Sequence, residues 1–217
     1  DIVHVPTLSD GPDPAAVEKA FAGGAGSLIL CNPNNPLGFT FTAERIRELA
    51  DIAAKYGARI ISDEIHAPVV LEGEHVPAAS VSDVADAVTI TVTATSKGWN
   101  TAGLKCAQIL LNEADDETWR GLAHVIKEGV STLGMVSATA AYRDGGPWLD
   151  EFKDVLRANL DTIERRLPEI APGAVMNRPR ASYLAWIDFR GVDGLVDRDG
   201  NPVEPQKWLL SNAKVAL

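Results

Sequence analysis

Residues 93–105 read Thr-Ala-Thr-Ser-Lys-Gly-Trp-Asn-Thr-Ala-Gly-Leu-Lys and follow the β-forming run Val88-Thr-Ile-Thr-Val-Thr93. Apolar, β-branched runs bounded by small polar residues are typical of buried parallel strands, so residues 88–93 are predicted to form one. Lys97 then lies just beyond the carboxyl end of a strand, where open α/β sheets bind ligands. A partly desolvated lysine there can lose its proton and attack a carbonyl carbon. The alternative is a solvated loop lysine, the usual environment of this residue type.

Two earlier strands are also predicted to end in polar groups. The apolar run Ser27-Leu-Ile-Leu-Cys31 stops at Asn32-Pro-Asn-Asn-Pro-Leu-Gly38, whose prolines and asparagines predict a turn. A helix over residues 43–56 follows, and the next strand, over residues 58–63, ends at Asp63. This β-α-β order with short connections predicts parallel strands. The polar ends of all three strands should therefore lie along one edge of the sheet.

Local signals mark the remaining elements. Thr42 is suited to cap the helix over 43–56, and Gly57 is suited to end it. The other predicted elements are a helix over 14–21, a strand over 107–111, a helix over 115–128, a Gly/Ser-rich segment over 129–139, a helix over 147–167 closed by Pro168, a strand over 183–189 and a helix over 204–213.

Asp63 needs a partner, because an unpaired buried carboxylate is very costly. A helix cap, an ion pair with a nearby basic group or a bound cationic ligand would each satisfy it. A metal site built from Asp63, Glu64 and His66 is disfavoured, since nothing nearby adds a ligand at a recognisable spacing. His66 is equally compatible with a satisfied interior histidine.

The composition argues against several classes of partner. A net charge of −10 disfavours nucleic acid and anionic membrane surfaces. No apolar run approaches the roughly 20 residues that span a bilayer, and the N-terminus lacks a signal-peptide pattern. Cys31 and Cys106 are predicted to be buried free thiols in a reducing compartment. A cytoplasmic enzyme without nucleic-acid or membrane partners is expected.

The three strand ends combine an amide, a carboxylate and an aldehyde-reactive amine, from Asn35, Asp63 and Lys97, with Lys105 as a second cation. Pyridoxal phosphate requires such a set: an amine that forms an imine, a carboxylate beside the protonated pyridine nitrogen, an amide on the phenolate oxygen, and hydroxyls with a cation on the phosphate. Asp63 and the pyridinium would compensate each other's desolvated charge.

Three segments together resemble the signatures of fold-type I, class I/II aminotransferase-like enzymes: Asn32-Pro-Asn-Asn-Pro-Leu-Gly38, Ser62-Asp-Glu-Ile-His-Ala67 and Thr95-Ser-Lys-Gly-Trp-Asn-Thr-Ala-Gly-Leu-Lys-Cys-Ala107. Within that superfamily the chain resembles the cystathionine β-lyase (C–S lyase) branch of the MalY and PatB type. Its markers are His66 where aminotransferases usually carry tyrosine, Lys105 where they usually carry arginine, and residues 141–150 and 182–190.

The resemblance implies pyridoxal phosphate as cofactor and a role for each matching residue. Lys97 would be the Schiff-base lysine and the base that removes the substrate α-proton. Asp63 would pair with the pyridine nitrogen, and Asn35 with the ring oxygen. His66 takes the place of the tyrosine that usually shares that oxygen. Ser96 and Lys105 would hold the phosphate.

Ala94 departs from this pattern, because many relatives have a second phosphate-binding serine there. Thr93 and Thr95 are the two candidates to replace that hydroxyl.

The fold implied by the resemblance is α/β, a three-layer α-β-α PLP-transferase large domain with a mostly parallel sheet. Residues 1–170 would form this domain without its N-terminal part, and residues 171–217 the beginning of the small C-terminal domain. The implied activity is a PLP-dependent β-lyase that cleaves cystathionine-like amino acids to a thiol, pyruvate and ammonia. A class I/II aminotransferase and a catalytically inactive fragment or regulatory module are the alternatives. The expected partners are a small amino-acid substrate and a second copy in a homodimer, with 129–139 as a candidate contact segment.

Overall fold

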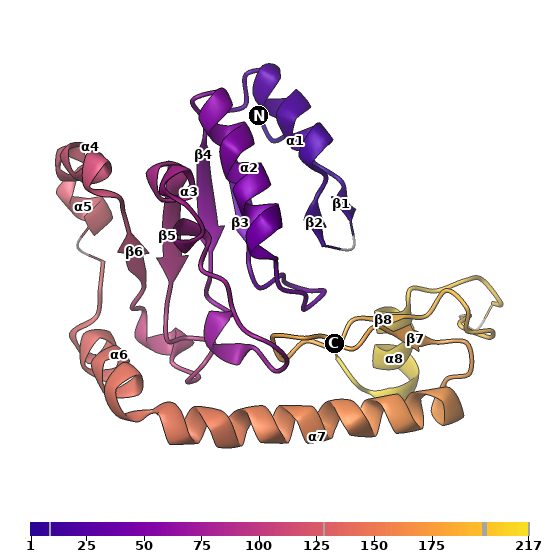
Figure 1. Cartoon of the computed structure of the whole chain (residues 1–217). Helices are drawn as coiled ribbons and strands as arrows, with labels where there is room; N and C mark the ends of the chain where they lie inside the picture. The colour runs from indigo at the N-terminus through magenta and orange to yellow at the C-terminus, as the bar shows by residue number, and fades with distance from the viewer. Residues whose placement is uncertain (9, 128, 197–198, 217) are drawn as a thin grey trace.

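A four-stranded sheet forms the centre of the molecule (Figure 1). The computed structural model describes residues 1–8, 10–127, 129–196 and 199–216. In spatial order the sheet contains β3 (Ser27–Cys31), β4 (Arg59–Asp63), β5 (Thr89–Thr93) and β6 (Gln108–Leu110). The first three strands are parallel, and β6 runs antiparallel to β5. The predicted α/β class with a mostly parallel sheet is confirmed.

Three helices pack their apolar residues against one face of the sheet: α1 (Pro14–Ala22), α2 (Ala43–Lys55) and α3 (Asp83–Val88). The predicted cap of α2 is present, since the Thr42 hydroxyl accepts a hydrogen bond from the Arg45 N–H at 3.2 Å. The predicted apolar stripe of this helix is fully buried, and it consists of Ile46, Leu49, Ala50 and Ala53. Helix and sheet thereby share one hydrophobic core.

The opposite face of the sheet is more open. Ile29, Ile61 and Ile90 lie side by side on it, because these residues are paired in register. Alternate residues of a strand point to opposite faces, so β3 buries Leu30 and leaves Ile29 73% exposed. Within the described residues, only one face of the edge strand β3 is therefore covered.

A helix, α6 (Thr132–Asp144), occupies the segment for which the sequence predicts a Gly/Ser-rich connection. Ser131 caps it by accepting a hydrogen bond from the Gly134 N–H at 3.3 Å. A Cβ at Gly134 would lie 2.5 Å from the carbonyl oxygen of Leu104, in the short 3-10 helix η3 (Ala102–Leu104). Glycine therefore permits close packing here and does not break the helix, an element that the sequence analysis did not predict.

The helix predicted over residues 115–128 is interrupted. Leu122 is extended, directly after a glycine, which is unfavourable in a helix interior. Glu128 lies outside the described residues. The segment consists of η4 (Glu113–Asp115), α4 (Asp116–Gly121) and α5 (His124–Lys127).

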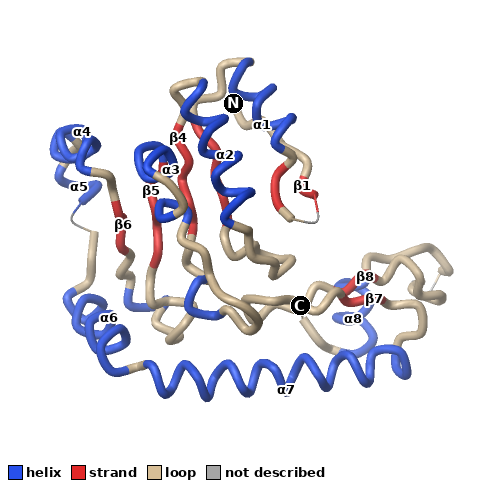
Figure 2. Tube along the Cα trace, viewed as in Figure 1, coloured by secondary structure: helices blue, strands red, loops and turns tan. Residues whose placement is uncertain are grey.

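The long helix α7 (Gly146–Ile170) runs along the side of the molecule where the strand ends emerge (Figure 2). The sequence predicts its end at Leu167, with Pro168 closing it, but Pro168 lies inside the last turn. A proline removes its own N–H from the helix and crowds the carbonyl four residues earlier, but it leaves later N–H groups free to bond. The Ala171 N–H still donates to the Leu167 carbonyl at 2.9 Å, so the turn continues.

After α7 the chain forms a small antiparallel pair, β7 (Val175–Met176) and β8 (Ile187–Asp188), and then α8 (Pro205–Ala213). The final helix is confirmed, whereas the strand predicted over 183–189 is reduced to two residues. The preceding segment is held elsewhere: the Arg180 and Ala181 N–H groups both donate to the Gly38 carbonyl, at 2.8 and 2.9 Å. The proposed domain boundary after residue 170 remains a prediction.

The remaining elements are short, and they connect the main parts of the fold. None of the helices in the described residues has both the length and the apolar character needed to cross a lipid bilayer. The short connecting elements are β1 (Thr7–Leu8), β2 (Gly11–Pro12), η1 (Ala67–Val69) and η2 (Ala78–Ser80).

Candidate active site

Asp63 is the last residue of β4 and is half-buried. It pairs in register with Cys31 of β3 and Val92 of β5, so it lies at the middle of the carboxyl edge of the sheet. One carboxylate oxygen, Oδ1, accepts a hydrogen bond from the Ile65 N–H at 3.1 Å. No ion pair to Asp63 occurs within the described residues. Its charge therefore remains available to a cationic ligand.

The neighbouring carboxylate, Glu64, is fully engaged in the interior. It is 4% exposed, and Oε1 accepts hydrogen bonds from the Ser62 hydroxyl and the Ala78 N–H, both at 2.9 Å. Its other oxygen, Oε2, lies 2.7 Å from Nε2 of His75. The described residues contain no cluster of three possible metal ligands.

Lys97 lies in the turn that follows β5 and is half-buried, so it differs from a solvated loop lysine. The turn is held at two points. A Cβ at Gly98 would lie 2.8 Å from the Pro68 side chain, so the chain passes close to η1. Nε1 of Trp99 donates to the Gly145 carbonyl at 2.9 Å, at the start of α7. This packing fixes the position of Lys97 at the edge of the sheet.

His66 is 2% exposed, and its Nδ1 has no hydrogen-bond partner among the described residues. Burial lowers the pKa of His66, the positive charge of Lys97 lowers it further, and the Asp63 carboxylate acts in the opposite direction. His66 follows Asp63 by three residues at the same edge of the sheet. At neutral pH the imidazole is uncharged, and an uncharged imidazole with an unpaired nitrogen can bind a polar ligand atom.

Asn35 lies in the exposed turn after β3, and its N–H donates to the Cys31 sulfur at 3.3 Å. Burial raises the pKa of the Cys31 thiol, the hydrogen bond from Asn35 lowers it, and the negative charge of Asp63 raises it. Cys31 and Cys106 are both free thiols, but they are half-buried and not buried as predicted. Through Cys31, the Asn35 turn is adjacent to Asp63.

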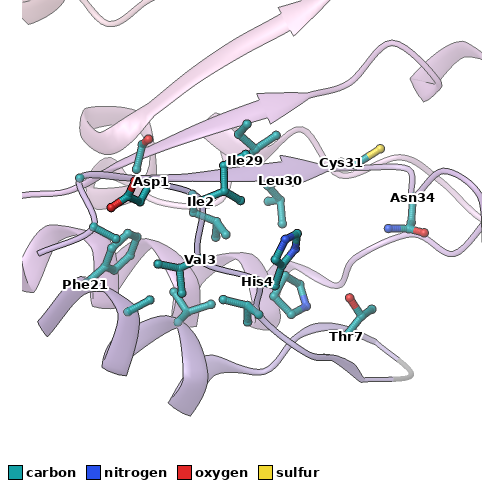
Figure 3. A pocket seen from close by; sticks show the side chains of 18 of the residues that line it. Asp1, Ile2, Val3, His4, Thr7, Phe21, Ile29, Leu30, Cys31 and Asn34 are labelled. Carbon is teal, nitrogen blue, oxygen red and sulfur yellow. The ribbon is translucent and has the colours of Figure 1, made fainter. Parts of the chain in front are cut away.

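A cavity of about 430 Å³ lies between the N-terminal segment, α1 and β3 (Figure 3). Figure 3 shows Cys31 and Asn34 at one end and Ile2 and Val3 along its length. Its lining does not include Asp63, His66 or Lys97. The cavity is therefore separate from the candidate active site.

The two candidate phosphate-binding residues, Ser96 and Lys105, both follow β5 in the chain, but no hydrogen bond or ion pair within the described residues joins their side chains to the other candidates. Lys105 is exposed, with φ at +55°. The hydroxyls considered as substitutes at Ala94 are already engaged. Thr93 donates to the Glu64 carbonyl at 3.4 Å, and the buried Thr95 pairs with the Thr101 hydroxyl at 2.8 Å.

The structure adds one residue that sequence reasoning missed. The ring centroid of Tyr183 lies 5.8 Å from that of His66 and 6.0 Å from Nζ of Lys97. Tyr183 is about 90 residues away from Lys97 in the chain. Its segment is recognisable in the sequence, but no local signal indicates that its ring reaches the sheet edge.

A family model for aminotransferase class I and II matches residues 10–216. The chain belongs to the aminotransferase class I and II family. The family resemblance inferred from the three sequence segments is thereby confirmed. These segments contain Asn35, Asp63, His66, Ser96, Lys97 and Lys105.

Relatives within the family connect it to carbon–sulfur lyases. The cystathionine β-lyase of Corynebacterium glutamicum is 54% identical over 177 residues, covering 81% of this chain and 48% of that protein. PatB, a cystathionine β-lyase of Bacillus subtilis, is 36% identical and covers 88% and 48%. The chain spans about half the length of these relatives.

Comparison with a solved structure identifies the fold. A protein from Corynebacterium diphtheriae, assigned as a PLP-dependent β-cystathionase, matches with a TM-score of 0.88 at 47% sequence identity. The match covers 95% of this chain and 53% of that chain. The fold is therefore that of PLP-dependent aminotransferase-like enzymes.

Proposed function

We propose that the protein to which this chain belongs is a PLP-dependent carbon–sulfur β-lyase that converts a cystathionine-like amino acid and water to a thiol, pyruvate and ammonia. The observation that carries the proposal is the position of Asp63 at the carboxyl edge of the sheet, with Lys97 and His66 both beside the Tyr183 ring. The 54% identity to a cystathionine β-lyase supports the reaction type.

The donor set fits pyridoxal phosphate. Asp63 has no ion-pair partner in the described residues, and its carboxylate matches a protonated pyridine nitrogen. His66 offers a buried, unpaired Nδ1 toward a polar ring substituent. The Asn35 side chain would bind the same substituent. Bound PLP would supply an electron sink that stabilises negative charge at the substrate Cα.

Lys97 would perform two functions in this site. Its amine would hold the cofactor covalently and, once displaced by the substrate amine, would remove the proton from the substrate Cα. The turn that fixes Lys97 against η1 and α7 keeps Nζ at the edge of the sheet for both steps. Ser96 and Lys105 would bind the phosphate, with Lys105 supplying the positive charge.

An aminotransferase is the second candidate, because the family model carries that activity and aminotransferases are among the relatives. The two activities are separable. A lyase releases pyruvate from cystathionine without any added keto acid, whereas an aminotransferase requires a keto-acid acceptor.

A homodimer and a boundary between two domains near residue 170 complete the proposal. α6 supports the dimer, since Leu133 is 70% and Val136 is 64% exposed on a helix that belongs to the predicted contact segment. Exposed apolar residues of this size are typical of surfaces covered by a partner. The net charge of −10 argues against a nucleic-acid partner.

The first experiment is covalent trapping. The purified chain is mixed with PLP, its visible spectrum is recorded, borohydride is added, and the modified peptide is mapped. We expect the pyridoxyl group on Lys97, with less trapping in Asp63→Ala. Labelling spread evenly over surface lysines, in this chain and in the whole protein, would contradict the proposal. Release of pyruvate from cystathionine by the whole protein then tests the reaction type.

A further inference from the structure

The segment that carries Tyr183 is anchored to two loops of the active site. The Arg180 and Ala181 N–H groups donate to Gly38, in the turn that holds Asn35. The Leu71 N–H donates to the Arg180 carbonyl at 2.8 Å, and the Ser182 N–H donates to the Val69 carbonyl at 2.8 Å. Residues 69–71 follow β4 and His66. The position of Tyr183 is thus determined by the same loops that present the candidate cofactor-binding residues.

The backbone at Ser182 is strained. Its φ is +71°, in the left-handed region that non-glycine residues rarely adopt. Ser182 is completely buried, and its hydroxyl has no hydrogen-bond partner among the described residues. Such conformations persist where the surrounding structure imposes them, and they concentrate at functional sites. Here the strained residue directly precedes the tyrosine that turns toward Lys97.

One part of Tyr183 packs against His66, and another part is exposed. It contacts His66 at a tilt of 58° and lies 6.0 Å from Nζ of Lys97, while 42% of the residue stays exposed. A substrate bound through its amine at Lys97 would lie beside this ring. The face of an aromatic ring carries a partial negative charge, so it disfavours carboxylates and favours apolar groups and sulfur.

We propose that Tyr183 is a specificity-determining residue, whose ring selects amino acids with a thioether side chain over those with an acidic one. The proposal rests on the proposed function, because it requires a substrate bound at Lys97. It assigns to residues 179–183 a task that the sequence motifs do not indicate. The hydroxyl group of Tyr183 has no part in this selection.

Methionine and glutamate test this proposal, since their side chains are similar in length but end in a thioether and a carboxylate. Their dissociation constants are measured on the PLP-loaded whole protein from changes in visible absorbance, which requires no turnover. We expect tighter binding of methionine. Tyr183→Leu should reduce the methionine preference by about two- to tenfold, the range of sulfur–aromatic contacts, and Tyr183→Phe should retain it.

Tyr56→Leu is the matched control, because Tyr56 is 37% exposed and carries Lys55 over its ring at 5.3 Å, at the C-terminal end of α2. This variant should leave the methionine preference unchanged. A preference unaltered in Tyr183→Leu, or lost equally in Tyr183→Phe, would overturn the assignment of the ring. Borohydride trapping on Lys97 is measured in every variant. Trapping at Lys97 with no effect of Tyr183 contradicts this inference alone, whereas absence of trapping contradicts the proposed function.

Discussion

The carboxyl edge of the sheet and the interior beside it are built in opposite ways, although they share the same strands. In β4, Ile60 and Ser62 are completely buried and contacted on all sides. Asp63, the next residue, retains an unpaired charge among the described residues, and His66 keeps an unpaired ring nitrogen. The interior buries apolar side chains and fully engages the Glu64 carboxylate, and so supplies stability. The edge leaves polar groups unsatisfied and so can bind a ligand.

Lys97→Ala should produce the largest difference between the two regions, because it should abolish function at the edge and leave the interior intact. We expect loss of PLP trapping and a fall in activity of at least about a hundredfold, because both the attachment point and the base are removed. The free energy of unfolding of the apo chain should change by no more than about 0.5 kcal/mol. Peptide mapping and urea unfolding measure these quantities. Lys19→Ala, on the exposed side of α1, is the control and should trap PLP normally.

Leu49→Ala should show the converse behaviour. Leu49 is completely buried in α2, so its truncation leaves a cavity and should lower the free energy of unfolding by about 2–5 kcal/mol. Trapping at Lys97 by the folded fraction should persist. Urea unfolding checks the loss, with Val155→Ala as a control at an exposed apolar position of α7. An equal loss in both variants would show that the interior is not the source of stability.

Asp63→Asn removes a charge at the edge while retaining the shape. The Asn side chain can still accept the Ile65 N–H bond, so unfolding should be little affected. The dissociation constant for PLP should rise roughly ten- to hundredfold, the contribution of a charge-assisted hydrogen bond. Absorbance titration of the whole protein measures it. Asp51→Asn, at an exposed position of α2, should bind PLP with unchanged affinity.

His66 should produce the smallest effect, a pH dependence of stability. Its pKa is lowered in the folded state, chiefly by burial and then by Lys97, so the unfolded state binds more protons near pH 6.5. Stability should therefore fall as the pH drops through this region, by at most about 1.4 kcal/mol per pH unit. Urea unfolding between pH 7.5 and 5.5 should show a shallower fall in His66→Asn. His4→Asn, at an exposed residue, should retain the original slope.

Much of this arrangement follows from local sequence. The N-cap at Thr42, the apolar stripe of α2 and the β-branched runs are near-neighbour patterns, and they predict the β-α-β order correctly. Parallel strands then bring Asn35, Asp63 and Lys97 to one edge without any knowledge of side-chain contacts. The roles of these residues, and those of Ser96 and Lys105, remain predictions.

The features that the sequence failed to predict depend on distant contacts. The need for a glycine at position 134 arises only from its packing against the Leu104 carbonyl oxygen, about 30 residues away in the chain. The ring of Tyr183 reaches Lys97 because Gly38 and Val69 hold the preceding residues. Neither relation leaves a periodic signal, since each depends on how elements far apart in the chain pack together.

Gly38 has a mechanical consequence. Its φ is +70°, and a Cβ there would lie 2.3 Å from the Pro179 side chain, so the turn containing Asn35 and the segment leading to Tyr183 interlock. The Arg180 and Ala181 N–H groups also donate to the Gly38 carbonyl, which joins the two backbones directly. An opening or closing of the C-terminal region that hinges outside residues 179–182 would leave this contact, and with it the register of the two segments, unchanged.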